Sequence, residues 1–298
     1  MSICVVGSIN ADLTVNVERH PVPGETLLGG GGGITAGGKG ANQACAAARL
    51  GAEVVLVGAT GCDANSGPAT ALLDDAGVDL THVEEVDSVT GLAVIAVSAD
   101  GENTIIVVPG ANTEVGADFV DRHAAPVREA ELVLLQGEIP ADGFARAAEL
   151  ATGRVVVNLA PVVEVPREAL LHADPLMANE HEAGLILSQL GLDGAGTPEE
   201  LARRLLGAGF ASVVLTLGSA GALVAQDGVF EHVASPAVEA IDTVGAGDAF
   251  AGAFCHRVVE GDTLVEAARF ACRVGAFSVT LPGAQPSYPS STDPLPGM

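Results

Sequence analysis

Residues 242–250, with the sequence DTVGAGDAF, combine a glycine pair and an aspartate directly before an apolar segment with helical spacing. If Gly247 and Asp248 open that helix, its first N–H groups and its dipole form an anion-binding site. A carboxylate at the edge of such a site is unusual unless its charge takes part in the chemistry. Taken alone, the stretch favours an ordinary interpretation, with Asp248 as a helix N-terminal residue after a Gly-rich turn. A second glycine cluster changes that balance.

This second cluster, residues 35–44 (TAGGKGANQA), leads into an Ala-rich segment and contains Lys39, the only lysine in the chain. Residues 33–39 match the Gly-x-x-x-x-Gly-Lys pattern of a P-loop, but Gly40 stands where the magnesium-binding Ser or Thr belongs. A dinucleotide fingerprint cut from the same run lacks its preceding strand and following helix. We therefore expect close backbone approach to a small ligand, with hydrogen bonds from Lys39 and Asn42. The alternative is a flexible turn with a solvated lysine.

Polar side chains also follow several strand-like runs at the point where each run ends. Residues 3–7 are a short apolar run ended by glycine, and Asn10 and Asp12 follow it. Similar polar residues stand at 136–138, 158, 179–182 and 216–221. Because the carboxyl ends of strands in a doubly wound sheet share one edge, these groups are expected to converge with Lys39 and Asp248. Each one taken singly also fits a cap or an Asx-type turn.

The elements that must position these groups alternate along the chain between strand-like and helix-like runs. Residues 155–159 and 213–217 are short apolar runs typical of buried strands, and 142–151 and 180–190 have helical patterns. Thr197-Pro198-Glu199-Glu200 is a capping box with proline at the first helical position, which predicts a helix at 198–207. The alternation predicts an α/β protein with a doubly wound, mostly parallel sheet flanked by helices.

Two segments interrupt this alternation and predict a small β excursion from the main body. Residues 13–17 alternate apolar and polar side chains, and residues 29–33 are an uninterrupted glycine run. Residues 90–97 and 103–108 are strand-like and flank Asp100-Gly101, a hairpin turn signal. We therefore expect residues 13–35 and 89–108 to form a separate small β unit, and residues 1–12, 36–88 and 109–298 to form the α/β body.

The composition argues against several classes of partner. Thirteen basic and 38 acidic residues give a formal net charge of −25, which argues against nucleic acid and anionic membranes. No apolar run reaches the roughly 18 residues of a membrane span, and the N-terminus lacks the basic region of a signal peptide. The five cysteines are scattered, with no Cys-x-x-Cys pair, at Cys4, Cys45, Cys62, Cys255 and Cys272. Reduced cysteines of a cytoplasmic protein are expected.

Three stretches together identify a family. Residues 7–12 (GSINAD), 37–44 (GGKGANQA) and 242–248 (DTVGAGD) resemble the ribokinase-like, phosphofructokinase-B type carbohydrate kinases. The similarity continues through Pro161, 179–183, 216–221 and 283–287, so it covers nearly the whole chain. The resemblance implies a ribokinase-like fold and ATP-dependent phosphorylation of a sugar's primary hydroxyl, with conversion of D-ribose to D-ribose 5-phosphate as the expected reaction.

The resemblance also implies roles for individual residues. Asp248 would be the general base, and the N–H groups of Gly245, Ala246 and Gly247 would form the anion hole for the transferring phosphoryl group. The matching sugar-binding positions are Asn10, Asp12, Gly38, Lys39, Gly40, Asn42, Glu138 and Asp248. The matching ATP positions are Asn179, Thr216, Leu217, Gly218, Ser219, Ala220, Gly221, Gly247 and Cys272.

Two metal ions and a partner are implied in the same way. Magnesium would be organised indirectly by Glu182. A potassium loop, acting mostly through backbone carbonyls, would comprise Asp242, Val244, Ser278, Leu281, Gly283 and Ser287. Residues 13–35 and 89–108 resemble the β-sheet lid of the family. This lid would close over the sugar and exclude water from the reaction, and it would pair with a second subunit to give a homodimer.

Three alternatives stay open on the sequence. The first is another sugar kinase of the family, acting on deoxyribose, fructose or a nucleoside. One tyrosine and no tryptophan argue against a pocket for a nucleoside base. The second is a non-catalytic sugar- or nucleotide-binding regulator, against which the intact motif at 245–248 argues. The third is a Rossmann-type dehydrogenase, which the missing fingerprint context weakens.

Overall fold

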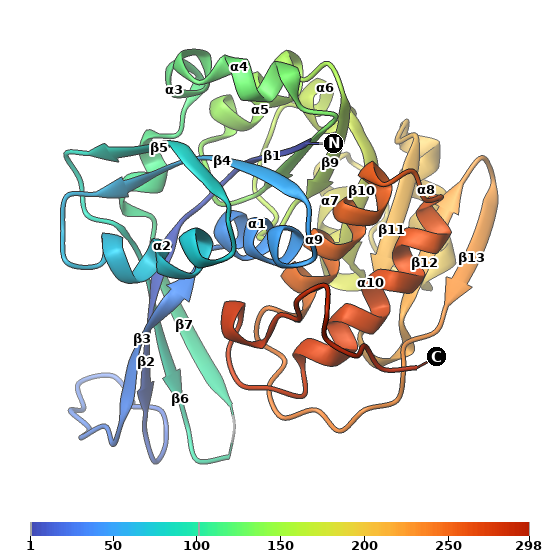
Figure 1. Cartoon of the computed structure of the whole chain (residues 1–298). Coiled ribbons are helices and arrows are strands. Elements are labelled where there is room, and N and C mark those ends of the chain that lie inside the picture. Colours follow the sequence, from blue (N-terminus) through green and yellow to red (C-terminus); the bar gives the residue numbers. More distant parts are fainter. Residues whose placement is uncertain (1, 101, 298) are drawn as a thin grey trace.

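The computed structural model describes residues 2–100 and 102–297 and centres on a nine-stranded sheet (Figure 1). Its spatial order is β13-β12-β11-β10-β9-β8-β1-β4-β5. Neighbours from β11 to β5 pair in parallel, while β12 and β13 add antiparallel strands at one edge. The bounds are β1 (Ser2–Val6), β4 (Glu53–Gly61), β5 (Asp79–Val86), β8 (Leu132–Gln136), β9 (Arg154–Asn158), β10 (Ala173–Asn179), β11 (Ser212–Thr216), β12 (Ala222–Gln226) and β13 (Val229–Val233). The predicted doubly wound, mostly parallel sheet is confirmed.

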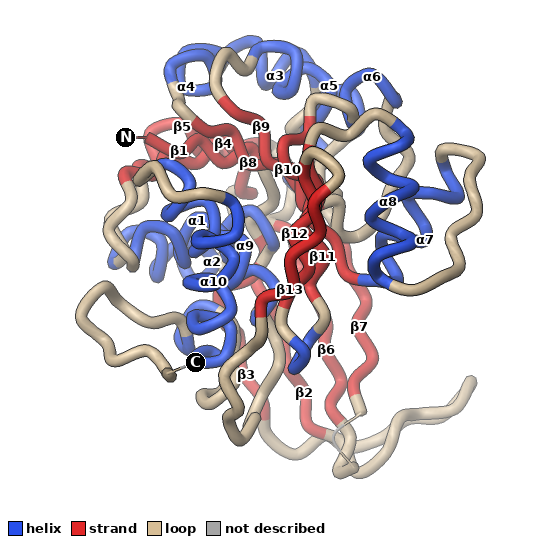
Figure 2. The backbone as a smooth tube through the Cα atoms, turned by 90° about the vertical axis from the view of Figure 1, so that its right-hand side faces the viewer, coloured by secondary structure: helices blue, strands red, loops and turns tan. Residues whose placement is uncertain are grey.

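Helices cover both faces of this sheet, as Figure 2 shows in side view. One apolar cluster contains side chains of α1 (Lys39–Arg49), α2 (Ser66–Asp75), α9 (Ala246–Val259) and α10 (Leu264–Ser278). The opposite cluster involves α3 (Ala117–Arg122), α4 (Ala124–Glu129), α5 (Ala141–Leu150), α6 (Arg167–Leu170), α7 (Glu180–Gln189) and α8 (Pro198–Ala208). Successive residues of β1 alternate between the clusters, because adjacent side chains of a strand point to opposite faces. A strand covered on both faces must be apolar throughout.

The predicted helix signals match the observed helix ends. At Thr197 the side chain accepts from the N–H of Glu200 and the Glu200 carboxylate accepts from the N–H of Thr197, so the capping box is complete. The same arrangement starts α7 at Asn179 and α10 at Thr263. Gly209, in the left-handed region at φ 116°, ends α8. No helix in the described part of the chain is long and apolar enough to cross a membrane.

A second, four-stranded sheet projects from the body (Figure 1). Its order is β3-β2-β6-β7, with β2 (Asn10–Asn16), β3 (Gly32–Gly37), β6 (Gly91–Val97) and β7 (Asn103–Val108). The β2–β6 pair is parallel and the other two pairs are antiparallel. The sheet reaches further than predicted, because pairing of β2 with β3 already begins at Asn10 and Gly37. Gly101 of the expected hairpin turn lies outside the described residues, and the division into lid and body stays a prediction.

Helices α1 and α9 approach each other closely along the side of the sheet. A Cβ added to Gly252 of α9 would lie 2.5 Å from the carbonyl oxygen of Gln43 and 2.7 Å from Cβ of Ala46. Real Cβ atoms do not tolerate such contacts, so only glycine permits this distance between the two helix backbones. The approach brings the N-terminal ends of α1 and α9, which carry Lys39 and Asp248, to one place.

A pair of glycine substitutions tests this packing. Gly252→Ala should lower the free energy of unfolding by about 1–3 kcal/mol, because the added methyl group must push α1 and α9 apart. Gly207→Ala is the matched control, since Gly207 lies in α8 with open space around its Cβ position. It should raise stability by about 0.5–1 kcal/mol through helix propensity alone. Urea unfolding of both variants measures the difference, and equal effects would contradict the close approach.

Candidate active site

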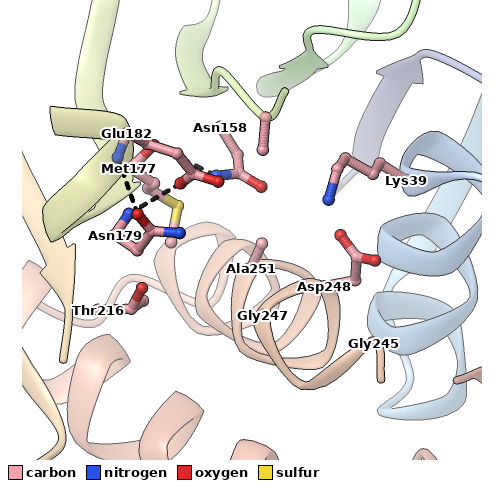
Figure 3. Close-up of a pocket in the computed structure, with 11 residues that line it drawn as sticks. Lys39, Asn158, Met177, Asn179, Glu182, Thr216, Gly245, Gly247, Asp248 and Ala251 are labelled. Carbon is pink, nitrogen blue, oxygen red and sulfur yellow. Dashed lines mark hydrogen bonds between the residues drawn. The ribbon is translucent and has the colours of Figure 1, made fainter. Parts of the chain in front are cut away.

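A pocket lies at the carboxyl ends of the central strands, opposite the N-terminal ends of α1 and α9 (Figure 3). Strands β9, β10 and β11 each end in a polar residue that lines it, as the strand-end pattern predicted. In Figure 3, Asn158, Met177, Asn179, Glu182 and Thr216 face Lys39 and Asp248 across the cavity. The complete lining is Lys39, Asn158, Ala160, Met177, Asn179, Glu182, Thr216, Gly245, Gly247, Asp248 and Ala251.

The N-terminus of α9 opens into this pocket without a side-chain cap. Gly245 precedes it in the left-handed region at φ 72°, and a Cβ there would lie 2.5 Å from Oη of Tyr288. Among residues 2–100 and 102–297, no hydrogen bond uses the N–H of Gly247 or Asp248, whereas the N–H of Ala246 donates to the carbonyl of Thr243 at 3.3 Å. The free N–H groups and the helix dipole favour an anion at this end.

Asp248 is 7% exposed, and each of its carboxylate oxygens accepts one hydrogen bond from an amide on α1. Nδ2 of Asn42 donates to Oδ2 at 3.0 Å, and Nε2 of Gln43 donates to Oδ1 at 2.9 Å. Nζ of Lys39 points toward the same carboxylate in Figure 3. The negative charge of Asp248 raises the pKa of Lys39, and the carboxylates of Glu138 and Glu182 act in the same direction against the effect of burial.

Glu138 is fixed beside the N-terminus of α1. Its Oε2 accepts from the N–H of Lys39 at 3.0 Å and from Oγ of Ser8 at 2.5 Å. Oγ of Ser8 in turn accepts from the N–H of Gly40 at 3.2 Å. The sequence analysis quoted Ser8 within the GSINAD motif but gave it no role. Its hydrogen-bond partner Glu138 lies 130 residues away in the sequence, so no local sequence pattern predicts this contact.

Asn10 and Asp12 lie on β2, the first strand of the small sheet, next to Gly37 and Gly38. Oδ1 of Asn10 accepts from Nδ2 of Asn112 at 2.7 Å, and Asn112 also bonds both backbone groups of Ile9. The sequence analysis missed Asn112. A Cβ at Gly37 would lie 2.2 Å from the Asp12 carboxylate, so the glycine motif is required for this carboxylate to fit. Asn10 is therefore held by a residue 102 positions along the chain.

Asp12 carries a buried acceptor that is free in the protein. Its Oδ1 has no hydrogen-bond partner among the described residues. Burial, and then the charges of Glu138 and Asp248, raise the pKa of Asp12 to about 6. A buried polar atom without a partner is costly, and the hydroxyl of a bound ligand would supply the missing donor. This end of the site therefore suits a ligand rich in hydroxyl groups.

The far side of the pocket contains only part of the predicted nucleotide positions. Asn179 and Thr216 line it, but Leu217, Gly218, Ser219, Ala220 and Gly221, in and around the 3₁₀ helix η2 (Gly218–Ala220), do not. The side chains of Asn179 and Glu182 bond each other's backbone N–H groups in the capping box of α7. Cys272 is 4% exposed within the apolar cluster, and burial raises the pKa of its thiol to about 11. A nucleotide contact by Cys272 stays a prediction.

The predicted cation-loop residues form a structured region beneath the helix end. Oδ1 of Asp242 accepts from the N–H of Val244 at 3.0 Å, and Oδ2 accepts from the N–H of Gly283 at 2.8 Å. This carboxylate therefore joins two loops that are 41 residues apart in sequence. The hydroxyls of Ser278 and Ser287 donate to carbonyls of their own segments. Leu281 lies in the turn after α10 and is 40% exposed.

Comparison with known proteins identifies the family of this chain. The family model for the pfkB family carbohydrate kinases matches residues 1–291. The chain belongs to this family.

Curated relatives and solved structures agree over nearly the whole length. A ribokinase of Haemophilus influenzae is 36% identical, with 99% of this chain and 97% of the relative covered, and a deoxyribokinase of Salmonella typhi is 35% identical, with 97% and 96% covered. A ribokinase structure from Thermotoga maritima superposes with a TM-score of 0.92 at 33% identity, covering 98% and 97%. An Arabidopsis thaliana ribokinase structure complexed with ribose and ATP gives 0.88 at 36% identity, covering 97% and 96%.

In a pfkB family carbohydrate kinase, a nucleotide and a sugar must meet at one phosphoryl group. The predicted sugar-binding residues Asp12 and Asn42 do not line the described pocket, but both lie close to Asp248, which does. Asn179 and Thr216 face Asp248 across the pocket. The free N–H groups at the start of α9 lie beside Asp248. Phosphoryl transfer depends mainly on positioning and charge stabilisation, which this arrangement can supply.

The raised pKa of Asp12 predicts a pH-dependent stability of the ligand-free protein. An unperturbed aspartate has a pKa of about 3.9, against about 6 for Asp12 in the fold. The contribution of Asp12 to the free energy of unfolding is therefore complete below about pH 4 and is lost as the pH rises through about 6. Asp12→Asn should raise stability by more at pH 8 than at pH 5, as measured by urea unfolding.

Asp79→Asn provides a control of opposite sign. Hydrogen bonds from Thr81 lower the pKa of Asp79, so its carboxylate stabilises the fold at neutral and higher pH. Its replacement should give no gain at pH 8. An Asp12→Asn effect of the same size at both pH values would contradict the buried, charge-opposed state of Asp12.

Proposed function

We propose that this protein transfers the γ-phosphoryl group of ATP to the 5-hydroxyl of D-ribose, giving D-ribose 5-phosphate and ADP. The single observation that carries the proposal is the position of Asp248 at the uncapped N-terminus of α9, with free N–H groups beside it. Ribokinase relatives at 34–38% identity, matched over 96–99% of this chain, and the ribose- and ATP-bound Arabidopsis structure support this assignment.

In the proposed mechanism the sugar is held by buried acceptors and Lys39. The free Oδ1 of Asp12 takes a sugar hydroxyl, while Asn10, Asn42, Lys39 and Glu138 bind others. These groups come from β2, the N-terminus of α1 and the segment after β8. Asn42 and Lys39 lie beside Asp248, so in the proposed complex the 5-hydroxyl points toward Asp248. Multidentate polar recognition favours a polyol over an analogue that leaves buried groups unpaired.

Asp248 then accepts the proton of the 5-hydroxyl as the new bond between O5 and the γ-phosphorus forms. The bond between that phosphorus and the bridging oxygen of ADP breaks, and the electron pair leaves with ADP. Full deprotonation of an alcohol at neutral pH is costly, so proton transfer accompanies bond formation. The N–H groups of Gly245 and Gly247 stabilise the phosphoryl oxygens. The hydrogen bond from Ala246 to Thr243 is long and must open if its N–H joins them.

The residues present also fit two cations. Oε2 of Glu182 accepts from Asn179, while no hydrogen bond of the described residues involves Oε1, which faces the pocket side of α7 and can order a magnesium ion through its water. Magnesium, when bound, neutralises charge on the ATP phosphates. The predicted cation-loop residues near Asp242 offer backbone carbonyl oxygens, which are hard ligands that suit potassium. Asp242 already ties these loops together beneath the anion hole.

Sugar-dependent ADP release with Mg-ATP tests the function. D-ribose should give the highest kcat/KM in a panel with deoxyribose, fructose and adenosine. In Asp248→Asn, ribose binding should stay within a few-fold while turnover falls by about 10²–10⁴, the usual contribution of a general base. Deoxyribose as the best substrate would move the specificity to that sugar. Near-normal turnover of the variant would remove Asp248 as base, and no sugar-dependent ADP release would favour a binding regulator.

The lid also supports a homodimer. Strand β7 is an edge strand, and its four consecutive residues Ile105, Ile106, Val107 and Val108 are 43–63% exposed. Exposed, apolar edge strands are prone to pair with other chains unless something covers them. We propose that the lid of a second copy of this chain covers β7. This contact would also stabilise the sheet that carries Asn10 and Asp12.

Light scattering after size exclusion measures the assembly directly. The protein should run at twice its 29.7 kDa chain mass, and Ile106→Lys should shift it to one chain mass, because a lysine at the centre of the contact must be desolvated. Val229→Lys is the matched control, since Val229 is 58% exposed on β13, the edge of the large sheet. A monomeric wild type, or dissociation by the control alone, would place the interface elsewhere.

A further inference from the structure

Asp248 is held by a buried chain of amide side chains that extends well beyond the pocket. Its two oxygens accept from Asn42 and Gln43, and two further glutamines contact these amides from behind. Resting on the proposed function, we propose that Gln43 and Gln285 are positioning residues that fix the Asp248 carboxylate in its productive orientation. Both glutamines are fully buried and neither lines the described pocket, so both would act through Asp248 and not on substrate.

All polar atoms of Gln43 are engaged, which leaves this side chain a single orientation. Its Nε2 donates to Oδ1 of Asp248 at 2.9 Å and to Oδ1 of Asn158 at 2.9 Å. Its Oε1 accepts from Nε2 of Gln136 at 2.8 Å. Gln43 is fully buried, so water cannot replace these partners. Because Gln136 supplies a donor to the oxygen, the NH₂ group of Gln43 must face the carboxylate.

Gln285 fixes Asn42, the second amide that donates to Asp248. Its Nε2 donates to Oδ1 of Asn42 at 3.0 Å, and this directs the NH₂ group of Asn42 toward Oδ2 of Asp248. Gln285 is fully buried at the start of the 3₁₀ helix η3 (Gln285–Ser287), where its carbonyl accepts from Arg49. If Gln285 lost its amide, Asn42 could turn its oxygen toward the carboxylate, which is repulsive.

Two buried glutamine oxygens near Asp248 lack a hydrogen-bond partner in the described part of the chain, although apolar side chains at these positions would cost less free energy to bury. Oε1 of Gln136 and Oε1 of Gln285 are buried and have no partner among the described residues. Such atoms are uncommon in native proteins and point to a function for the group that carries them. Here the function is orientation, since neutral donors fix a carboxylate without cancelling the charge that a base needs.

The charged and titratable groups around Asp248 come from four different segments. Lys39 faces it from α1, Asp12 from β2, Glu138 from the segment after β8, and Tyr288 from the segment after η3. Gln43 and Gln285 leave all of these charges in place when they are replaced by a neutral side chain. Any change in the pH dependence of turnover then reports the lost hydrogen bonds.

Gln43→Met and Gln285→Met test the proposal, because methionine has a similar volume but cannot donate. For each, kcat should fall about 10- to 100-fold, the usual effect of a small misplacement of a reacting group. KM for sugar and for ATP should change by less than about 3-fold, because the loss falls on the transition state. The acid limb of the kcat profile should move to higher pH, since a carboxylate that loses a donor holds its proton more tightly.

Ser212→Ala is the matched control for losing a buried hydrogen bond. Ser212 is fully buried at the start of β11, where its hydroxyl donates to Asp174. The Ser212→Ala variant should leave kcat and the acid limb of the kcat profile unchanged. A merely structural role for the glutamines would lower stability without moving the acid limb, and that result would overturn the proposal. Two glutamine variants are used so that a folding failure in one leaves the other to decide.

A second readout separates this proposal from the proposed function. The ¹³C resonance of the Asp248 carboxyl, identified by its loss in Asp248→Asn, is followed against pH without substrate. Its titration midpoint should move up in both glutamine variants. Unmoved midpoints would overturn the positioning role even if ribose is the substrate. Moved midpoints in a protein that does not phosphorylate ribose would leave that role intact and the substrate assignment wrong.

Discussion

The structure depends on the close packing of α1 against α9, which no residue larger than glycine at position 252 would allow. The two helices come from opposite ends of the chain, yet their N-terminal ends must meet for the site to exist. The N-terminal end of α1 supplies Lys39 and the amides that bind the Asp248 carboxylate. The N-terminal end of α9 supplies Asp248 and the free N–H groups. A separation greater by one methyl group would break hydrogen bonds of 2.9–3.0 Å before it disturbed either helix.

Electrostatics give the site an unusual balance. Three carboxylates, on Asp248, Glu138 and Glu182, act on the one lysine of a chain whose net charge is −25. Side-chain cations are therefore scarce beside the pocket. In the proposed function, the free N–H groups of α9 and the helix dipole would take over much of the binding of phosphate. Backbone donors are rigid and carry no full charge, so they can stabilise a transferring phosphoryl group without neutralising Asp248 beside it.

The parts of this architecture that were predictable from sequence are local ones. The alternation of strands and helices, the capping box at Thr197 and the glycine motifs depend on residues close together in the chain. The small sheet includes Asn10 and Asp12, which pair with β3 although their side chains are predicted to belong to the site. Asn112 and Gln285 were missed because their partners lie 102 and 243 residues away, and a single sequence records no such pairing.

Asp12 joins the predicted sugar-binding groups to the small sheet. It lies on β2, which is hydrogen-bonded to both β3 and β6, so any force on its carboxylate acts on the whole small sheet. Without ligand, its buried oxygen lacks a donor and its charge is opposed by Glu138 and Asp248. Under the proposed function, a sugar hydroxyl would satisfy this oxygen and favour the arrangement in which β2 stays close to α1. The free energy gained at this hydrogen bond would then help to hold the small sheet over the pocket, so that closure would depend on a ligand with the right hydroxyl.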